Sequence, residues 1–128
     1  MNVLLDTHTL IWFYQDDSNL SVAARTCLRD PANEKYVSPA SYWEIAIKLG
    51  TGKLTLADPY PDFLQHAILD NGFLILPIEF RHTAEVVALP LHHRDPFDRL
   101  LIAQAIVEGM PVLSADPAFD AYPVQRIW

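Results

Sequence analysis

The sequence predicts an α/β domain in which a mainly parallel sheet is covered by helices on both faces, a three-layer α/β/α sandwich. Short apolar runs alternate with segments that carry helix-start and helix-stop signals over the whole chain. No Gly/Ser-rich linker, repeat or low-complexity tract interrupts this alternation, so we expect residues 1–128 to form a single domain. Because 51% of the 128 residues are hydrophobic, the chain can bury a sizeable core.

The first half of the chain carries signals for two strands and four helices. The strands are expected at Val3–Leu5 and Lys35–Ser38, and the helices at residues 9–14, 21–29, 39–49 and 58–71. Ser21 and Ser38 are suitable N-caps, because their hydroxyl oxygens can accept hydrogen bonds from backbone N–H groups of the first turn. Pro39 fits the first helical position, and Gly50 is placed to end the same helix.

The second half begins with a continuous apolar run, Phe73–Ile78, which is typical of a buried strand of a parallel sheet. Helices are expected at residues 79–88 and 96–108, and Gly109 closes the second of them. The remaining strands are expected at Val112–Ser114 and at residues 124–128, the latter at an edge of the sheet. Strands separated by helices in this way imply parallel crossover connections.

Charge and cysteine content narrow the function classes. Nine Lys and Arg against sixteen Asp and Glu give a net charge of −7, which argues against nucleic-acid binding through a broad basic face. Bound divalent cations or a basic partner would have to supply the missing positive charge. A single cysteine, no secretory signal pattern and no apolar run of ~18 to 20 residues lead us to expect a cytoplasmic protein without membrane insertion.

Five acidic residues stand at positions of structural interest. Asp6 directly follows the first strand, and Asp116 comes two residues after the strand near the C-terminus; a helix cap and an Asp-Pro turn would account for them. Glu44 lies among apolar helical residues, where its side chain either is buried or turns out to water. Asp98 falls in the first turn of a helix, where the helix dipole favours an acid, and Asp95 is the N-cap expected for that helix.

Four of these acids are expected to meet. In parallel sheets, ligands bind at the carboxyl ends of the strands, and this edge would collect Asp6, Glu44, Asp98 and Asp116 in one pocket. Close carboxylates repel each other, so the cluster implies raised pKa values or bound cations. Carboxylate oxygens, with no Cys and no His at ligand spacing, favour Mg²⁺ or Mn²⁺ over Zn²⁺.

The sequence resembles the PIN-domain ribonucleases and, within them, the VapC toxins of bacterial type II toxin–antitoxin pairs. The matching stretches are "LLDTHTLIW", "SPASYWEIAIKLGTGKL", "HHRDPFDRLLIAQA" and "VLSADPAF". Each stretch alone is weak evidence, but all four occur in the expected order at specific spacings and together span most of the chain.

The resemblance implies a metal-dependent endoribonuclease with a parallel α/β/α fold. Its catalytic and metal-binding acids would be Asp6, Glu44, Asp98 and Asp116. Thr7 and Ser114 would orient the carboxylates or a metal-bound water. Water would attack in line and leave 5′-phosphate and 3′-hydroxyl ends. Proteins of this kind are usually homodimers neutralised by a VapB-type antitoxin, and a basic antitoxin tail would account for the acidic surplus.

RNA binding requires positive charge beyond the metal. Four basic residues in the segments that flank the acids are therefore candidate RNA contacts: Lys48, Lys53, Arg94 and Arg99.

Other side chains near the acids have simpler interpretations. Trp12, Tyr42 and Trp43 could stack on bases, but aromatic residues beside apolar runs more often belong to the core. His92 and His93 are adjacent and so project in different directions, which argues against a shared metal site.

Two other functional classes remain open at this level. A phosphatase or phosphotransfer domain could carry an aspartyl nucleophile after the first strand, but the chain lacks the second Asp of haloacid-dehalogenase-type phosphatases and the late Lys of receiver domains. A non-catalytic acidic surface could bind a basic partner, although acids at buried strand ends do not favour that interpretation.

Overall fold

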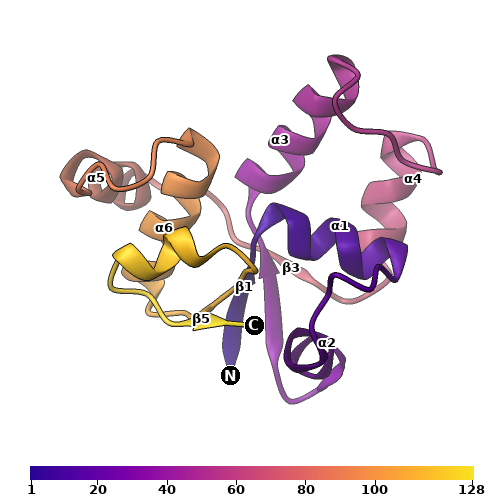
Figure 1. Cartoon of the computed structure of the whole chain (residues 1–128), viewed down its shortest axis with the longest axis horizontal. Helices are drawn as coiled ribbons and strands as arrows, with labels where there is room; N and C mark the ends of the chain where they lie inside the picture. The colour runs from indigo at the N-terminus through magenta and orange to yellow at the C-terminus, as the bar shows by residue number, and fades with distance from the viewer.

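The chain folds around a five-stranded sheet in which all strands are parallel, as seen in a computed structural model that describes residues 1–128 (Figure 1). The strands are β1 (Asn2–Leu5), β2 (Glu34–Val37), β3 (Leu74–Ile75), β4 (Val112–Leu113) and β5 (Arg126–Ile127). Their order across the sheet is β3-β2-β1-β4-β5, with Leu5 in register with Val37 on one side and Leu113 on the other. The first strand is thus central, and the chain reverses its direction of travel across the sheet at β1.

Six α-helices connect the strands. They are α1 (Thr7–Gln15), α2 (Val22–Arg29), α3 (Pro39–Gly50), α4 (Tyr60–Leu64), α5 (Phe80–Ala88) and α6 (Pro96–Glu108). A π-helical turn, η1 (Gln65–Leu69), continues α4, and a 3-10 helix, η2 (Pro117–Ala121), follows β4. The predicted N-caps Ser21 and Ser38 each accept a backbone N–H of the first turn, from Ala24 and Ala40.

The alternating side chains of β1 define the two faces of the sheet. Val3 and Leu5 pack into a core cluster that contains residues of α1, α2, α3 and the α4–η1 segment. Leu4 points to the opposite face, into a second cluster built mainly by α6 and including Phe119 of η2. Helical layers on both faces confirm the predicted three-layer α/β/α architecture.

The prediction of a strand within Phe73–Ile78 is confirmed, but its extent and its burial were wrong. Only Leu74 and Ile75 form a strand, β3, at the edge of the sheet, and both side chains are exposed. Phe73 and Leu76 on either side are the buried residues of the run. A continuous apolar run does not distinguish a central strand from an edge strand of this kind. The predicted C-terminal edge strand is confirmed as β5.

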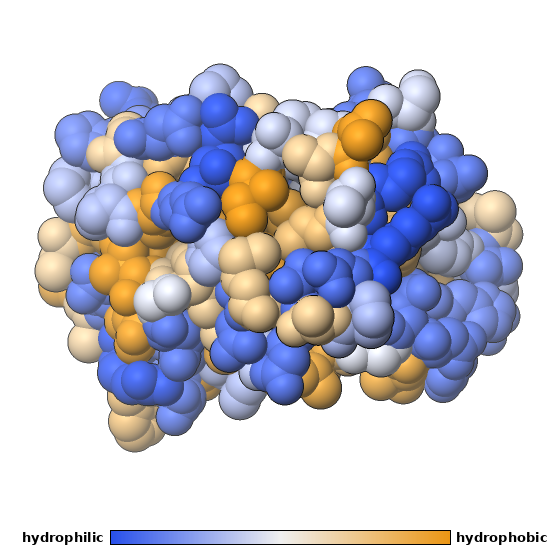
Figure 2. Space-filling model, turned by 90° about the horizontal axis from the view of Figure 1, so that it is seen from below, coloured by the Kyte–Doolittle hydropathy of each residue, from blue (hydrophilic) through white to orange (hydrophobic).

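No helix is both long enough and apolar enough to cross a membrane. The face seen from below the sheet, at the amino ends of the strands, mixes hydrophilic residues with scattered apolar ones (Figure 2). Asp6 and Asp116 follow the carboxyl ends of β1 and β4, whereas Glu44 and Asp98 lie on α3 and α6.

Candidate active site

Asp6 stands at the carboxyl end of the central strand and is 5% exposed. Its Oδ1 accepts a hydrogen bond of 2.8 Å from the backbone N–H of Thr9 and so caps α1. Capping occupies one carboxylate oxygen and leaves Oδ2 outside the cap. The cap and the site interpretations of Asp6 are therefore compatible.

Asp116 divides its two oxygens in the same way. Oδ1 accepts a 2.9 Å hydrogen bond from the N–H of Ala118 and caps η2. Oδ2 faces His93, with a distance of 3.6 Å to the ring Nε2. The carboxylate is about half exposed, so one oxygen serves the fold while the other lies at an accessible pocket.

Asp95 and Asp98 open α6 together and have different roles. Oδ1 of Asp95 accepts the N–H groups of Phe97 and Asp98, at 2.8 and 3.1 Å, so Asp95 is the helix cap that the sequence predicts. Because that position is filled, the Asp98 side chain is free to face the neighbouring strand ends. Its Oδ2 lies 3.0 Å from Nε2 of His93.

Glu44 lies in the middle of α3 and is buried rather than turned to water, at 4% exposure. Its Oε1 accepts a 2.7 Å hydrogen bond from the hydroxyl of Thr7, and its Oε2 pairs with the ammonium of Lys48 at 2.8 Å. Both oxygens of this carboxylate are thus held by groups of the protein, and the Lys48 charge lies at the acid cluster.

The two hydroxyl residues have distinct contacts. Thr7 donates to Glu44 and so links the start of α1 to the middle of α3. The Ser114 hydroxyl oxygen accepts the N–H of Asp116 at 3.0 Å, and its hydrogen bond to Asp6 lowers the pKa of that carboxyl. Both side chains are buried.

His93 is the residue of this site that the sequence did not predict. Its Nδ1 accepts the backbone N–H of Asp95 at 3.2 Å, so in the neutral ring the proton sits on Nε2. The buried Nε2 lies between Asp98 and Asp116 without a hydrogen-bond partner of good geometry. The expectation that no histidine stands at ligand spacing is therefore wrong, although the spacing His93-x-Asp95 in "HHRDPFD" could have signalled a turn that folds the ring onto the start of α6.

Two carboxyl groups of the cluster, those of Asp98 and Asp6, have raised pKa values. Burial and the neighbouring charge of Asp95 raise the pKa of Asp98 to about 7; the charges of Asp6 and Glu44 add to the rise, while His93 opposes it. Burial also raises the pKa of Asp6, against hydrogen bonds from Ser114 and Thr9 that lower it. The carboxylates thus lie close enough to repel one another, and a bound cation would relieve that repulsion.

The donor set fits a divalent cation that prefers oxygen. Ligand atoms of His93, Asp98 and Asp116 all lie within 4.8 Å of one another. Because the Nε2 proton of His93 blocks its lone pair, the carboxylates of Asp98 and Asp116 are the ligands offered, with Asp6 beside them. Such a set suits Mg²⁺ or Mn²⁺.

A second group of possible ligands, Glu79, His82 and Glu108, behaves differently. Nδ1 of the buried His82 accepts the N–H of Glu79 at 3.0 Å, so its Nε2 carries the proton and faces Glu108 at 2.9 Å. Arg81 also pairs with both glutamates. These groups pair with one another and tie the start of α5 to the end of α6.

The candidate RNA contacts separate into two groups. Lys53 and Arg94 are exposed. The Arg99 guanidinium instead donates to backbone carbonyls of four residues: Val86, Leu89, Pro90 and His93. These contacts fix the chain before α6 and occupy both terminal nitrogens of Arg99, which argues against its assignment as an RNA contact.

The aromatic residues also differ from expectation in one case. Trp43 is 61% exposed and its ring meets Phe97 edge-on, at a centroid distance of 5.3 Å, so the core interpretation was wrong for it. Trp12 and Tyr42 are partly buried and pack against the main core cluster.

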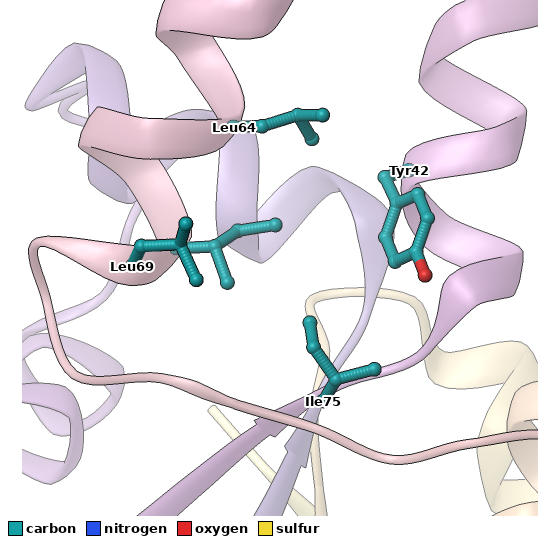
Figure 3. Close-up of a pocket in the computed structure, with 5 residues that line it drawn as sticks. Tyr42, Leu64, Leu69 and Ile75 are labelled. Carbon is teal, nitrogen blue, oxygen red and sulfur yellow. The ribbon is translucent and has the colours of Figure 1, made fainter.

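Two hollows lie near these residues. One, of about 230 Å³, has only apolar and aromatic lining residues, among them Tyr42, Leu64, Leu69 and Ile75, and includes none of the acids (Figure 3). The other, of about 250 Å³, includes Asp6 and Asp116 in its wall. Only the second hollow adjoins the candidate catalytic groups.

Comparison with known proteins agrees with this geometry. Ribonuclease VapC22 of Mycobacterium tuberculosis is 33% identical over 115 residues, which cover 89% of this chain and 86% of that protein. The structure of VapBC2 from Rickettsia felis, bound to a DNA fragment from their promoter, matches with a TM-score of 0.73 at 16% identity and covers 98% of this chain and 97% of the matched one. VapBC-1 from nontypeable Haemophilus influenzae matches with a TM-score of 0.66 at 15% identity, covering 98% and 96%.

At these identities the two structures establish a shared fold. Residues 3–125, nearly the whole chain, match the family model of the PIN domain. With the acids gathered at the edge of a parallel sheet and a curated relative at 33% identity, the chain belongs to the PIN domain family.

Proposed function

We propose that this protein is a divalent-metal-dependent endoribonuclease of the VapC type and acts as the toxin of a toxin–antitoxin pair. The observation that carries the proposal is the convergence of Asp6, Glu44, Asp98 and Asp116 at one sheet edge in a PIN domain. The relative named Ribonuclease VapC22 supports RNA as the substrate.

Asp98 and Asp116 are the proposed direct ligands of Mg²⁺ or Mn²⁺, with Asp6 beside them. When bound, such an ion lowers the pKa of a coordinated water and stabilises negative charge on the phosphate oxygens. Glu44 is fixed by Thr7 and Lys48 and completes the negative rim of the pocket. Asp6, Asp98 and Asp116 would orient an attacking water in line with the scissile bond, and its attack would leave 5′-phosphate and 3′-hydroxyl ends.

The proposed partners follow from charge and from the structural neighbours. A VapB-type antitoxin with a basic tail would neutralise the acidic groove of a chain whose net charge is −7. One structural neighbour is a toxin–antitoxin complex from Klebsiella pneumoniae. We further propose a homodimer that acts in the cytoplasm, with Lys53 and Arg94 as RNA contacts; Lys48 supports the site through Glu44.

Substitution of the central acid tests this function. Asp6→Asn should abolish RNA cleavage in vitro and growth arrest on expression, whereas Asp62→Asn, which changes an exposed carboxylate on α4, should do neither. EDTA should stop cleavage by the unaltered protein, and calorimetry should detect Mg²⁺ binding that Asp6→Asn weakens. Full cleavage by Asp6→Asn, or in excess EDTA, would refute the proposal. Hydrolysis of p-nitrophenyl phosphate without cleavage of RNA would support a phosphatase instead.

A further inference from the structure

The hollow beside the acids has a wall that the proposed metal chemistry does not use. It measures about 250 Å³ and is lined by Asp6, His8, Trp12, Ala115 and Asp116. Sites for drug-sized ligands measure ~300–1,000 Å³, so this hollow suits a single ring system. Its acidic side belongs to the candidate metal site, whereas its aromatic side has no role in holding a cation.

His8 and Trp12 form the aromatic side. They are four residues apart on α1 and so lie on the same face of the helix, with ring centroids 5.6 Å apart and planes inclined by 45°. Trp12 is backed by Trp128, at a centroid distance of 5.8 Å, and packs against the main core cluster. His8 is exposed. The wall thus combines one ring held by packing with one ring that is free to adjust.

We infer that this hollow binds one nucleobase of a single-stranded RNA, next to the phosphate that is cleaved. The inference rests on the proposed ribonuclease function and names a subsite for its substrate. Asp116 lines the hollow and belongs to the candidate metal site, and Asp6 lies in the same wall, so a strand whose phosphate reaches the metal has an adjacent base within reach of Trp12.

The chemistry of the wall favours a base over a phosphate. Asp6 and Asp116 would repel a phosphate that has no cation beside it, while an uncharged ring meets no such penalty. Bases of single-stranded RNA can be splayed out and stacked on aromatic side chains, and this stacking tolerates different sequences because every base has a π-face. The subsite therefore contributes affinity for RNA and positions the strand, and the metal ligands serve the cleavage of the phosphodiester bond.

The test compares RNA with a backbone that carries no bases. The probes are a short oligo(A) RNA and an abasic ribose-phosphate oligomer of the same length and charge. Binding is measured by fluorescence anisotropy with Ca²⁺ in place of Mg²⁺, since Ca²⁺ uses carboxylate oxygens with looser geometry, and a gel checks for cleavage. Unaltered protein should bind oligo(A) more tightly than the abasic chain. Trp12→Leu should bind oligo(A) roughly 5- to 100-fold more weakly and bind the abasic chain unchanged.

Further variants distinguish the loss of the base subsite from a general loss of folding. Trp12→Phe keeps a ring and should retain most of the preference for oligo(A), and His8→Ala changes an exposed side chain and should lose part of it. Trp43→Leu removes a similar, more exposed indole outside the hollow and should leave the preference intact. Circular dichroism confirms that each variant is folded.

The outcomes separate the subsite from the function on which it rests. If folded Trp12→Leu and His8→Ala both keep the full preference for oligo(A) while the protein cleaves RNA, the subsite is wrong and the function stands. If the unaltered protein neither binds nor cleaves either probe, the ribonuclease function fails and the subsite fails with it. If an arginine-containing peptide depends on Trp12 while oligo(A) does not, the hollow receives a protein partner and the inference is overturned.

Discussion

The Nε2 atom of His93 lies 3.0 Å from Oδ2 of Asp98 and 3.6 Å from Oδ2 of Asp116. Nothing in the ring itself requires this position; the turn before α6 imposes it. The N–H of Asp95 binds Nδ1 of the ring, and the guanidinium of Arg99 binds the backbone carbonyl of His93 at 3.3 Å. His93 is thus fixed at both its side chain and its backbone, and its buried Nε2 lies between the two carboxylates that we propose as metal ligands.

Replacing His93 should weaken metal binding although it is not itself a ligand. His93→Leu removes the ring nitrogen that lies beside Asp98 and Asp116, and loss of such an outer contact typically costs about 10- to 100-fold in metal affinity or activity. His93→Gln keeps an N–H donor and should retain part of the affinity. Calorimetric titration with Mg²⁺ measures the metal affinity of both variants, and cleavage rates over a range of Mg²⁺ concentrations measure their activity. His92→Gln is the matched control, because that ring meets Tyr122 rather than the acids; Mg²⁺ affinity unchanged in His93→Leu would contradict the role.

The hydrogen bond from Thr7 to Glu44 should contribute to stability. Thr7→Val keeps the shape of the side chain but leaves a buried carboxylate oxygen without its donor, which should cost about 1.5–3 kcal/mol in the free energy of unfolding. Thr7→Ser keeps the hydroxyl and should cost less. Urea denaturation with and without Mg²⁺ gives the comparison. Equal stability of the valine and serine variants would show that the hydroxyl is not needed.

The raised pKa of Asp98 predicts how stability of the metal-free protein depends on pH. The folded carboxyl has a pKa of about 7 against an ordinary value of 3.8, so between these values the folded state binds more protons than the unfolded state. Stability therefore falls as the pH rises through this window, and the penalty is complete above pH 7. Asp98→Asn has no such titration, so in EDTA its melting temperature should rise relative to the unaltered protein as the pH increases from 5 to 8.

Added Mg²⁺ should reverse the advantage in melting temperature that Asp98→Asn has over the unaltered protein in EDTA. Mg²⁺ should raise the melting temperature of the unaltered protein at pH 8 more than that of Asp98→Asn, because binding stabilises the folded state. Asp62→Asn, an exposed substitution, should follow the unaltered protein in both measurements. A melting-temperature difference between Asp98→Asn and the unaltered protein that stays constant with pH would disprove the linkage.

The sequence predicts the acids better than it predicts their surroundings. Asp6 and Asp116 follow apolar strands, and Asp98 follows a strong helix-start signal, so local rules suffice to bring them to one edge of a parallel sheet. The position of His93 depends on local contacts with Asp95 and Arg99 and, in addition, on a distant residue. The hydroxyl of Tyr122 accepts the N–H of His93 at 2.8 Å and donates to Pro90, a contact that no local pattern reveals.

The short edge strand β3 shows a second limit of local rules. The run Phe73–Ile78 is apolar throughout, yet its place at the edge leaves Leu74 and Ile75 exposed while Phe73 and Leu76 are buried. Which strand lies at an edge is decided by the order of strands across the sheet, and that order is a property of the whole fold.

Arg94 and Arg99 lie five residues apart but should respond to substitution in different ways. Arg94→Gln removes an exposed charge, so it should weaken RNA binding and reduce the slope of log affinity against log salt by about one unit, with little change in stability. Arg99→Gln removes hydrogen bonds to four backbone carbonyls and should lower the free energy of unfolding. Salt-dependent anisotropy with a short oligo(A) RNA and urea denaturation separate the two effects. Should Arg99→Gln keep full stability and lose the salt slope instead, Arg99 would return as an RNA contact and the turn that holds His93 would need another anchor.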